Sequence, residues 1–358
     1  MRVEVVRPDQ LSEADVTAWR AIQAGRTALM SPFLSPDWAR AVDRAAGPDQ
    51  VRVAVVRDGD EPRAFFAARC GRLTALPVGA PANDVQAVVA PEGFALDPAV
   101  LLRALGVHRY DFSHMAAEDP VFGASARGCQ DSFIVELSEG WEAYAASRRE
   151  AGTDILKDMA KKRRKLEREF GPVSFTPMSR SRSDFETLLA WKSDNYRRTR
   201  QTDVLAAPWV RRLLDELFES RDPGFGGALF TLHVGDRLAA AQFNLRGPDE
   251  INAWFIAHDH HFERCSPGLV LFHDLMEWMA GGPFRRLELG PVAYQFKERL
   301  ANRRRRIAYG FAGLPSPVTL IRAAQYGVRS AAERLPLGRA SHWPGKAMRR
   351  LDLWRGLG

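Results

Sequence analysis

A chain of 358 residues is too long for one ordinary domain and long enough for two, and its 46% apolar and 10% aromatic residues exclude a disordered protein. No apolar run reaches about 18 residues, so no membrane-spanning helix is predicted, and the first residues lack the apolar core of a signal peptide. The three cysteines are odd in number and far apart, which excludes a disulfide framework and a paired-cysteine zinc motif. These features predict a cytoplasmic protein without a bound metal.

The positive charge gathers at the C-terminal end. Residues 316–358 carry eight Lys and Arg against two acids, or +6, out of a net charge of +7 for the whole chain. Such a tail fits a peripheral contact with an anionic membrane, a phosphorylated substrate, or a surface helix in solvent. Because no recognised nucleic-acid motif accompanies the charge, we expect no nucleic-acid partner.

The first 150 residues predict a strand, two helices, a hairpin, a helix and a strand. The hairpin signal is Asp58-Gly59, and a basic helix over 154–170 follows this half. The expected strands are 3–7, 51–57, 63–69 and 109–112, and the expected helices are 12–24, 35–46 and 98–105.

The next segment predicts the order β-α-α-β-β-β-α-β-α-β. Gly235-Asp236 marks a hairpin, and the later strand–helix–strand unit must cross over in parallel. The expected strands are 173–178, 228–234, 238–245, 251–257, 286–290 and 306–312, and the expected helices are 184–198, 208–221, 268–280 and 293–301.

This order matches the GNAT acyltransferase fold, and the first half repeats it more loosely. The expectation is therefore an α/β (α+β) protein built from tandem GNAT-like halves, with mixed central sheets flanked by helices. The expected domains are an N-terminal half (1–150), a C-terminal acyltransferase domain (151–315) and a basic helical tail (316–358).

Residues from about 154 to 300 resemble the CelD/BcsL-type acetyltransferase domain of bacterial exopolysaccharide clusters, a GNAT branch related to the Fem-type transferases. Two positions depart from that family, because Phe296 and His258 stand where it usually has tyrosine. The motifs that carry the resemblance are Trp191-Lys192 with residues 196–199, residues 258–262, residues 266–269, Gly290 with Lys297, and, in the first half, residues 33–38.

The resemblance implies an enzyme that moves an acyl group from acetyl-CoA or a longer acyl-CoA onto an amine. The implied acceptor is an amino-sugar or lipid-linked precursor of a surface polysaccharide, bound in a cleft between the halves. Asp84 occupies a family position that would face this cleft. Two alternatives remain: a Fem-type transferase that uses aminoacyl-tRNA, and a non-catalytic accessory protein of envelope biosynthesis that has lost the family tyrosines.

The helix that begins after Ser266 is the predicted site for the coenzyme A diphosphate. Its unpaired N–H groups and dipole attract anions, and Gly268 lets the backbone approach closely. Arg264 would add positive charge, and Leu269 belongs to the same first turn. The competing interpretation is an ordinary N-terminus capped by the Ser266 side chain.

Candidates for the chemistry lie on both sides of that helix. The backbone N–H of Ile256 or Ala257 is the expected oxyanion donor. A histidine near its free pKa can take a proton from an ammonium, and His258 and Asp259, with Asp259 orienting an imidazole, are preferred over a merely exposed cluster. Tyr294 could protonate the leaving thiolate or be an interface tyrosine, and Lys297 could hold a substrate anion.

Overall fold

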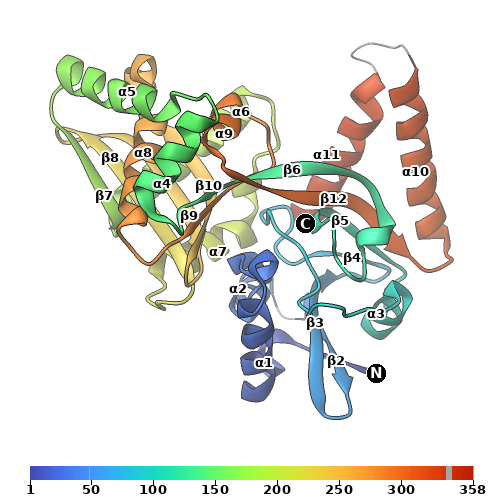
Figure 1. Ribbon diagram of the computed structural model, residues 1–358. Helices are drawn as coiled ribbons and strands as arrows, with labels where there is room; N and C mark the ends of the chain where they lie inside the picture. Colours follow the sequence, from blue (N-terminus) through green and yellow to red (C-terminus); the bar gives the residue numbers. More distant parts are fainter. Residues whose placement is uncertain (48, 336–340, 358) are drawn as a thin grey trace. The chain divides into compact units, whose positions relative to one another are not determined.

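The structure is a computed structural model that describes residues 1–47, 49–335 and 341–357 (Figure 1). It divides into two compact units that interleave along the chain. Unit 1 consists of Met1–Gln130, Ala207–Leu213 and Arg306–Gly358, and unit 2 of Asp131–Ala206 and Leu214–Arg305. In the described part of the chain, no helix is both long and apolar enough to cross a membrane.

Unit 1 contains six neighbouring strands of a mixed sheet. In sheet order these are β1 (Arg2–Val6), β2 (Val51–Asp58), β3 (Glu61–Cys70), β4 (Thr74–Pro77), β5 (Arg109–Ala116) and β12 (Arg303–Gly313). Its helices are α1 (Glu13–Ala24), α2 (Pro36–Ala46), α3 (Pro98–Leu105), α10 (Pro317–Arg334) and α11 (Trp343–Leu357). Neighbouring strands are antiparallel, except that β4 and β5 are parallel.

Unit 2 repeats the same succession of strand pairings. In sheet order its strands are β7 (Val173–Ser179), β8 (Gly226–Val234), β9 (Arg237–Arg246), β10 (Glu250–His258), β11 (Arg286–Gly290) and β6 (Ala126–Glu136). Only β10 and β11 are parallel. The helices are α4 (Gly140–Glu150), α5 (Ile155–Phe170), α6 (Arg182–Arg198), α7 (Pro208–Glu219, which begins in unit 1), α8 (Pro267–Ala280) and α9 (Gln295–Leu300).

The last strand of each sheet comes from a distant part of the chain. β6 follows β5 of unit 1 in sequence but pairs with β11 of unit 2, and β12 follows β11 but pairs with β5. The tandem GNAT-like order predicted from the sequence is therefore present, with an exchange of the closing strands that the sequence did not reveal.

Helices cover both faces of the unit 2 sheet. The register pairs Phe230 with Gln242 and Leu229 with Phe243, so Phe230 and Phe243 point to opposite faces. Phe243 meets Phe185 of α6 at a ring distance of 4.9 Å, and Phe230 meets Trp278 of α8 at 5.3 Å. α5 lies on the α8 side, because its buried residues Ile155, Met159 and Leu166 belong to the same core cluster as Phe230 and the apolar residues of α8.

The elements from 173 to 313 agree with the predicted order, but β4, β6 and α4 were not predicted. The tail also differs, because its prolines, Pro336 and Pro344, and its glycines predict short helical pieces, whereas two helices of 18 and 15 residues are found. Pro344 lies in the first turn of α11, where a proline loses no hydrogen bond, and Pro336 lies outside the described residues.

Candidate functional site

Strand β10 is irregular at the place where it parts from β11. Its pairing with β9 shifts register between Ala253 and Phe255, which marks a β-bulge at Trp254. It pairs with β11 only over residues 250–252, yet it continues to His258. Beyond Asn252 this edge of β10 can therefore offer backbone hydrogen bonds to an extended ligand, as an exposed strand edge does for a peptide.

The N-terminus of α8 lies beside this open stretch of β10. A Cβ placed on Gly268 would lie 3.6 Å from Cδ1 of Ile256, so the two predicted cofactor residues are neighbours. Ser266, the N-cap residue, has a φ of 51° and makes no side-chain cap. The interpretation of Ser266 as an ordinary capping serine is therefore wrong. Its backbone N–H is bound to Glu263, and its carbonyl accepts from Leu269.

Basic residues of α5 lie against the α8 N-terminus. Nζ of Lys162 donates to the free Oγ of Ser266 at 3.0 Å, and Nζ of Lys165 lies 3.5 Å from the carbonyl oxygen of Arg264. The sequence showed that this helix is basic but did not indicate which lysine approaches the α8 N-terminus. An ammonium beside a helix N-terminus adds to the positive potential for a diphosphate.

Arg264 was expected to supply that charge directly, but it is held by α5. Its guanidinium pairs with Glu169 at 3.1 Å and stacks over the ring of Phe170 at 4.9 Å. These contacts fasten the loop before α8 to α5, so we assign Arg264 a positioning contact in the loop and Lys162 the position nearest the α8 N-terminus.

His258, at the end of β10, has the properties of a proton acceptor. It is half-buried, and burial lowers the pKa of its imidazole below the ordinary value, with further lowering from His260. The ring is therefore neutral near pH 7. Its Nε2 is buried and makes no hydrogen bond to any described residue.

Asp259 does not orient an imidazole as predicted. One carboxylate oxygen accepts from Arg237 at 2.7 Å, and the other accepts from the backbone N–H of His261 at 2.9 Å. Burial raises the pKa of Asp259, but the hydrogen bonds from His261 and Arg237 outweigh it and hold the pKa below its usual range. The residue is thus an ionised cap of the 3-10 turn His260–Cys265.

Two of the family-like motifs meet at the end of α6. A guanidinium nitrogen of Arg198 lies 2.7 Å from Nε2 of His260. One helical turn and a half earlier, burial lowers the pKa of Lys192, whose ammonium lies 5.2 Å from the ring centre of Tyr196. A desolvated lysine on a helix that packs against β10 is a candidate for an anionic group of the acceptor.

Tyr294 and Lys297 are placed differently from each other. The Tyr294 ring is 55% exposed and stacks on Phe296 at 6.0 Å. Lys297 donates to the main-chain carbonyl of Leu289 and thereby ties α9 to β11. This contact gives Lys297 a structural role that its expected anion-binding role did not include.

A buried carboxylate, Glu288, lies where β10 and β11 separate. The sequence did not indicate it. Glu288 is 1% exposed and is directly paired in register with Asn252. It accepts a hydrogen bond from Ser132 of β6 at 2.5 Å and lies 3.7 Å from the guanidinium of Arg305. Its partners lie more than 15 residues away in sequence on either side, so no local pattern could have indicated it.

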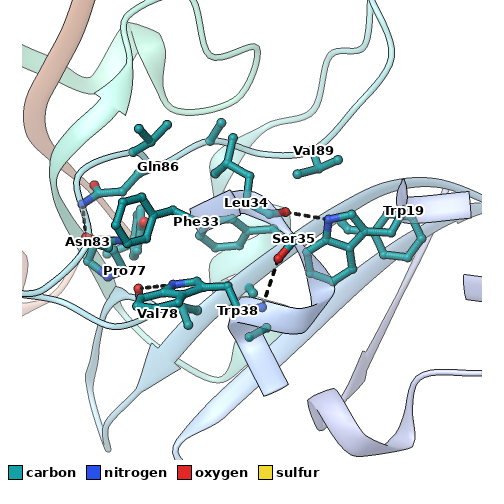
Figure 2. Close-up of a pocket in the computed structure, with 17 residues that line it drawn as sticks. Trp19, Phe33, Leu34, Ser35, Trp38, Pro77, Val78, Asn83, Gln86 and Val89 are labelled. Atoms are coloured by element: carbon teal, nitrogen blue, oxygen red, sulfur yellow. Dashed lines mark hydrogen bonds between the residues drawn. The ribbon is translucent and has the colours of Figure 1, made fainter. Parts of the chain in front are cut away.

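Asp84 belongs to unit 1, where it is half-buried next to Asn83. Asn83 lines a small aromatic cavity together with Phe33 and Trp38 of the family-like motif at 33–38 (Figure 2). The indole of Trp38 donates to the carbonyl of Val78 at 3.1 Å. The half-open cavity offers only about 30 Å³ to water-sized molecules, and Phe33 and Trp38 are themselves buried, so the motif packs the interior of unit 1.

Comparison with known proteins gives the class of the second segment. Residues 153–298 match the family described as the acetyltransferase (GNAT) domain. No curated protein sequence matches the chain at a significant level. The matched residues include the bulge in β10, the place where β10 separates from β11, and the N-terminus of α8. The protein is thus an enzyme of the GNAT N-acetyltransferase type, with its acetyltransferase domain in this segment.

Solved structures with a similar fold cover most of the chain. FemX aligns with a TM-score of 0.56 at 9% identity, over 90% of this chain and 99% of its own. The C-terminal domain of a putative lysylphosphatidylglycerol synthetase from Agrobacterium fabrum has a TM-score of 0.51 at 13% identity, over 87% and 95%. A conserved protein of unknown function from Bacteroides thetaiotaomicron has a TM-score of 0.52 at 10% identity, over 86% and 100%. At these identities the likeness concerns the fold.

Proposed function

We propose that this enzyme transfers an acyl group from acetyl-CoA or a longer acyl-CoA to the amine of an amino-sugar or lipid-linked precursor of a surface polysaccharide. The observation that carries the proposal is the open edge of β10 beside the N-terminus of α8. A pantetheine arm is an extended chain with amides, which suits a strand edge, and a diphosphate suits a helix N-terminus with a lysine beside it. The motif resemblance supports the CelD/BcsL-type branch.

In this proposal the cofactor residues are Ile256, Ala257, Ser266, Gly268 and Leu269. The diphosphate lies at the first turn of α8, and Lys162 leaves Ser266 to bind it. The thioester carbonyl then points to the backbone N–H of residue 256 or 257 on β10. These N–H groups are fixed by the strand before the reaction begins, so they stabilise the developing oxyanion without reorganisation.

Acyl transfer needs one proton removed and one supplied. The acceptor ammonium loses a proton to Glu288 or to neutral His258, and the free amine attacks the thioester carbonyl. The tetrahedral intermediate collapses to the amide, and the carbon–sulfur bond breaks. The thiolate then takes a proton, for which Tyr294 is the proposed donor. The products are the N-acylated acceptor and free coenzyme A, with no covalent enzyme intermediate.

Transfer from aminoacyl-tRNA is the second candidate. The likeness to FemX and the row of basic residues on α5 support it. Lys192 and Asp84 remain candidates for the acceptor in either case.

Calorimetric titration distinguishes the two candidates. The intact protein is titrated with acetyl-CoA, with longer acyl-CoAs and with aminoacyl-tRNA, and release of the coenzyme A thiol is followed with simple amino-sugars as acceptors. Micromolar binding of an acyl-CoA with amine-dependent thiol release supports the proposal. Binding of aminoacyl-tRNA without binding of any acyl-CoA would replace it by the Fem-type activity.

A further inference from the structure

Exposed apolar side chains gather on the last two helices. In the described part of the chain, eleven large apolar residues are exposed, and seven of them lie between 320 and 354. Two are tryptophans, Trp343 and Trp354, with 68% and 73% of their surface exposed. Single exposed apolar residues are ordinary, but a concentration of this kind marks an interaction surface. The seven are Leu320, Ile321, Val328, Leu335, Trp343, Leu351 and Trp354.

These side chains follow one stripe on each helix. On α10 the residues 320, 324, 328, 331 and 335 recur every three or four positions, opposite the buried Arg322 and Tyr326. On α11 the residues 343, 347, 351 and 354 do the same. Each helix therefore buries one side in unit 1 and leaves an apolar stripe outside.

The two helices are held rigidly enough to present those stripes. They lie side by side (Figure 1), and a guanidinium nitrogen of Arg322 on α10 binds Asp352 of α11 at 2.6 Å. Arg322 also pairs with Asp111 of β5 at 2.9 Å, and Arg355 of α11 pairs with the same carboxylate at 3.1 Å. Tyr326 stacks on Phe311 of β12. The buried charges therefore attach the two helices to each other and to β5.

The charges that remain outside are positive. Arg334, Lys346, Arg349 and Arg350 are exposed, and none of them forms an ion pair with another described residue. A surface that combines tryptophan and aliphatic side chains with unpaired cations is complementary to the headgroup region of an anionic bilayer, where indole rings favour the interface.

We propose that α10 and α11 form a docking surface for anionic phospholipid bilayers, with the apolar stripes in the headgroup region and the four cations against lipid phosphates. The surface lies in unit 1 and does not depend on acyl transfer. It goes beyond the proposed function because it localises the enzyme at the membrane, where a lipid-linked acceptor would be presented.

The test is co-sedimentation of the full-length protein with vesicles, without acyl-CoA. Binding is expected to vesicles that contain phosphatidylglycerol, to fall as salt rises, and to be weak with phosphatidylcholine alone. Trp343→Ser with Trp354→Ser lowers the partition coefficient by about tenfold or more, and so does Arg349→Glu with Arg350→Glu. The control Arg72→Glu with Arg103→Glu makes the same charge change at exposed sites elsewhere in unit 1 and leaves binding close to that of the parent protein.

Leu320→Ser with Val328→Ser tests the α10 stripe independently, so the proposal does not rest on one variant folding. All these side chains are exposed, and the melting temperatures are expected to stay near that of the parent. Failure to bind phosphatidylglycerol vesicles at low salt overturns the proposal. A dimer in light scattering that the tryptophan variants convert to monomers, without vesicle binding, shows instead that the surface joins two copies of this chain. Loss of acyl-CoA binding with vesicle binding intact would count against the proposed function alone.

Discussion

Lys162 gives the sharpest test of the proposed cofactor site. In the structure its ammonium donates a hydrogen bond to Oγ of Ser266, and the side chain is half-buried on the side of α5 that faces the start of α8. Lys162→Met keeps the length and apolar stem of the side chain and removes the charge. Because only the charged tip changes, packing against α8 is expected to survive.

The magnitude follows from the contact that would be lost. A hydrogen bond to a charged group contributes about 1.5–3 kcal/mol, and partial exposure places this one at the lower end. Exchange of the Ser266 contact for a diphosphate contact offsets part of the gain. We therefore expect the dissociation constant for acetyl-CoA to rise about tenfold, which corresponds to about 1.4 kcal/mol.

The assay is calorimetric titration at two salt concentrations, with Lys161→Met as the matched control. Lys161 is the exposed neighbour of Lys162 and carries the same charge without the contact to Ser266. The control is expected to bind acetyl-CoA nearly as tightly as the parent at moderate salt. Equal affinities for the two variants would refute the reasoning, because general charge and not position would then decide binding.

Four further outcomes follow from the same geometry. Gly268→Ala meets only ordinary contact in the structure, so the melting temperature is kept, while acyl-CoA binding measured by calorimetry weakens because the methyl group occupies the approach to the helix N-terminus. Glu288→Gln is expected to lower kcat by about a hundredfold with acyl-CoA affinity unchanged, and an unchanged kcat removes it as the base. Lys297→Ala loses its hydrogen bond to Leu289, which costs about 1–3 kcal/mol in chemical denaturation; full stability with a raised KM would restore the anion-binding role. His258 is neutral when folded, so as pH falls below about 6.5 the unfolded imidazole charges first and stability declines, and His258→Asn flattens this slope in thermal melts over that range.

The sequence was sufficient for elements with strong local signals. The turns at Gly59 and Gly235 have φ near 60° and 55°, which glycine adopts without strain, and both hairpins were predicted. β6 was missed because its first half, from Ala126, is largely exposed and carries polar residues, so its pattern is not that of a buried strand. It becomes a strand through pairing with β11, which is about 150 residues away.

The residues of the candidate site likewise divide into those with a local sequence signal and those placed by distant contacts. Ile256, Gly268 and His258 lie on one strand–loop–helix segment, and the sequence order alone brought them together. Lys162 is hydrogen-bonded to Ser266, 104 residues away in sequence, and Glu288 to Ser132, 156 residues away. Contacts over such distances leave no local pattern in the sequence. Asp259 was assigned to an imidazole because histidines surround it in sequence, whereas Arg237 of the preceding hairpin reaches it in space.

The exchange of closing strands also sets the order in which the newly made chain can fold. Strand β5 is made before unit 2, yet its edge stays unpaired until β12 is made, because the partner residues Ile307–Gly313 follow the last residue of unit 2 in the chain. At about 5–20 residues per second, the roughly 200 residues between β5 and the end of β12 take about 10–40 s to synthesise. Through that interval an unpaired strand edge, rich in buried apolar residues, is open to wrong partners. Strand β5 is thus made before unit 2 but gains this partner strand only after unit 2 has been made.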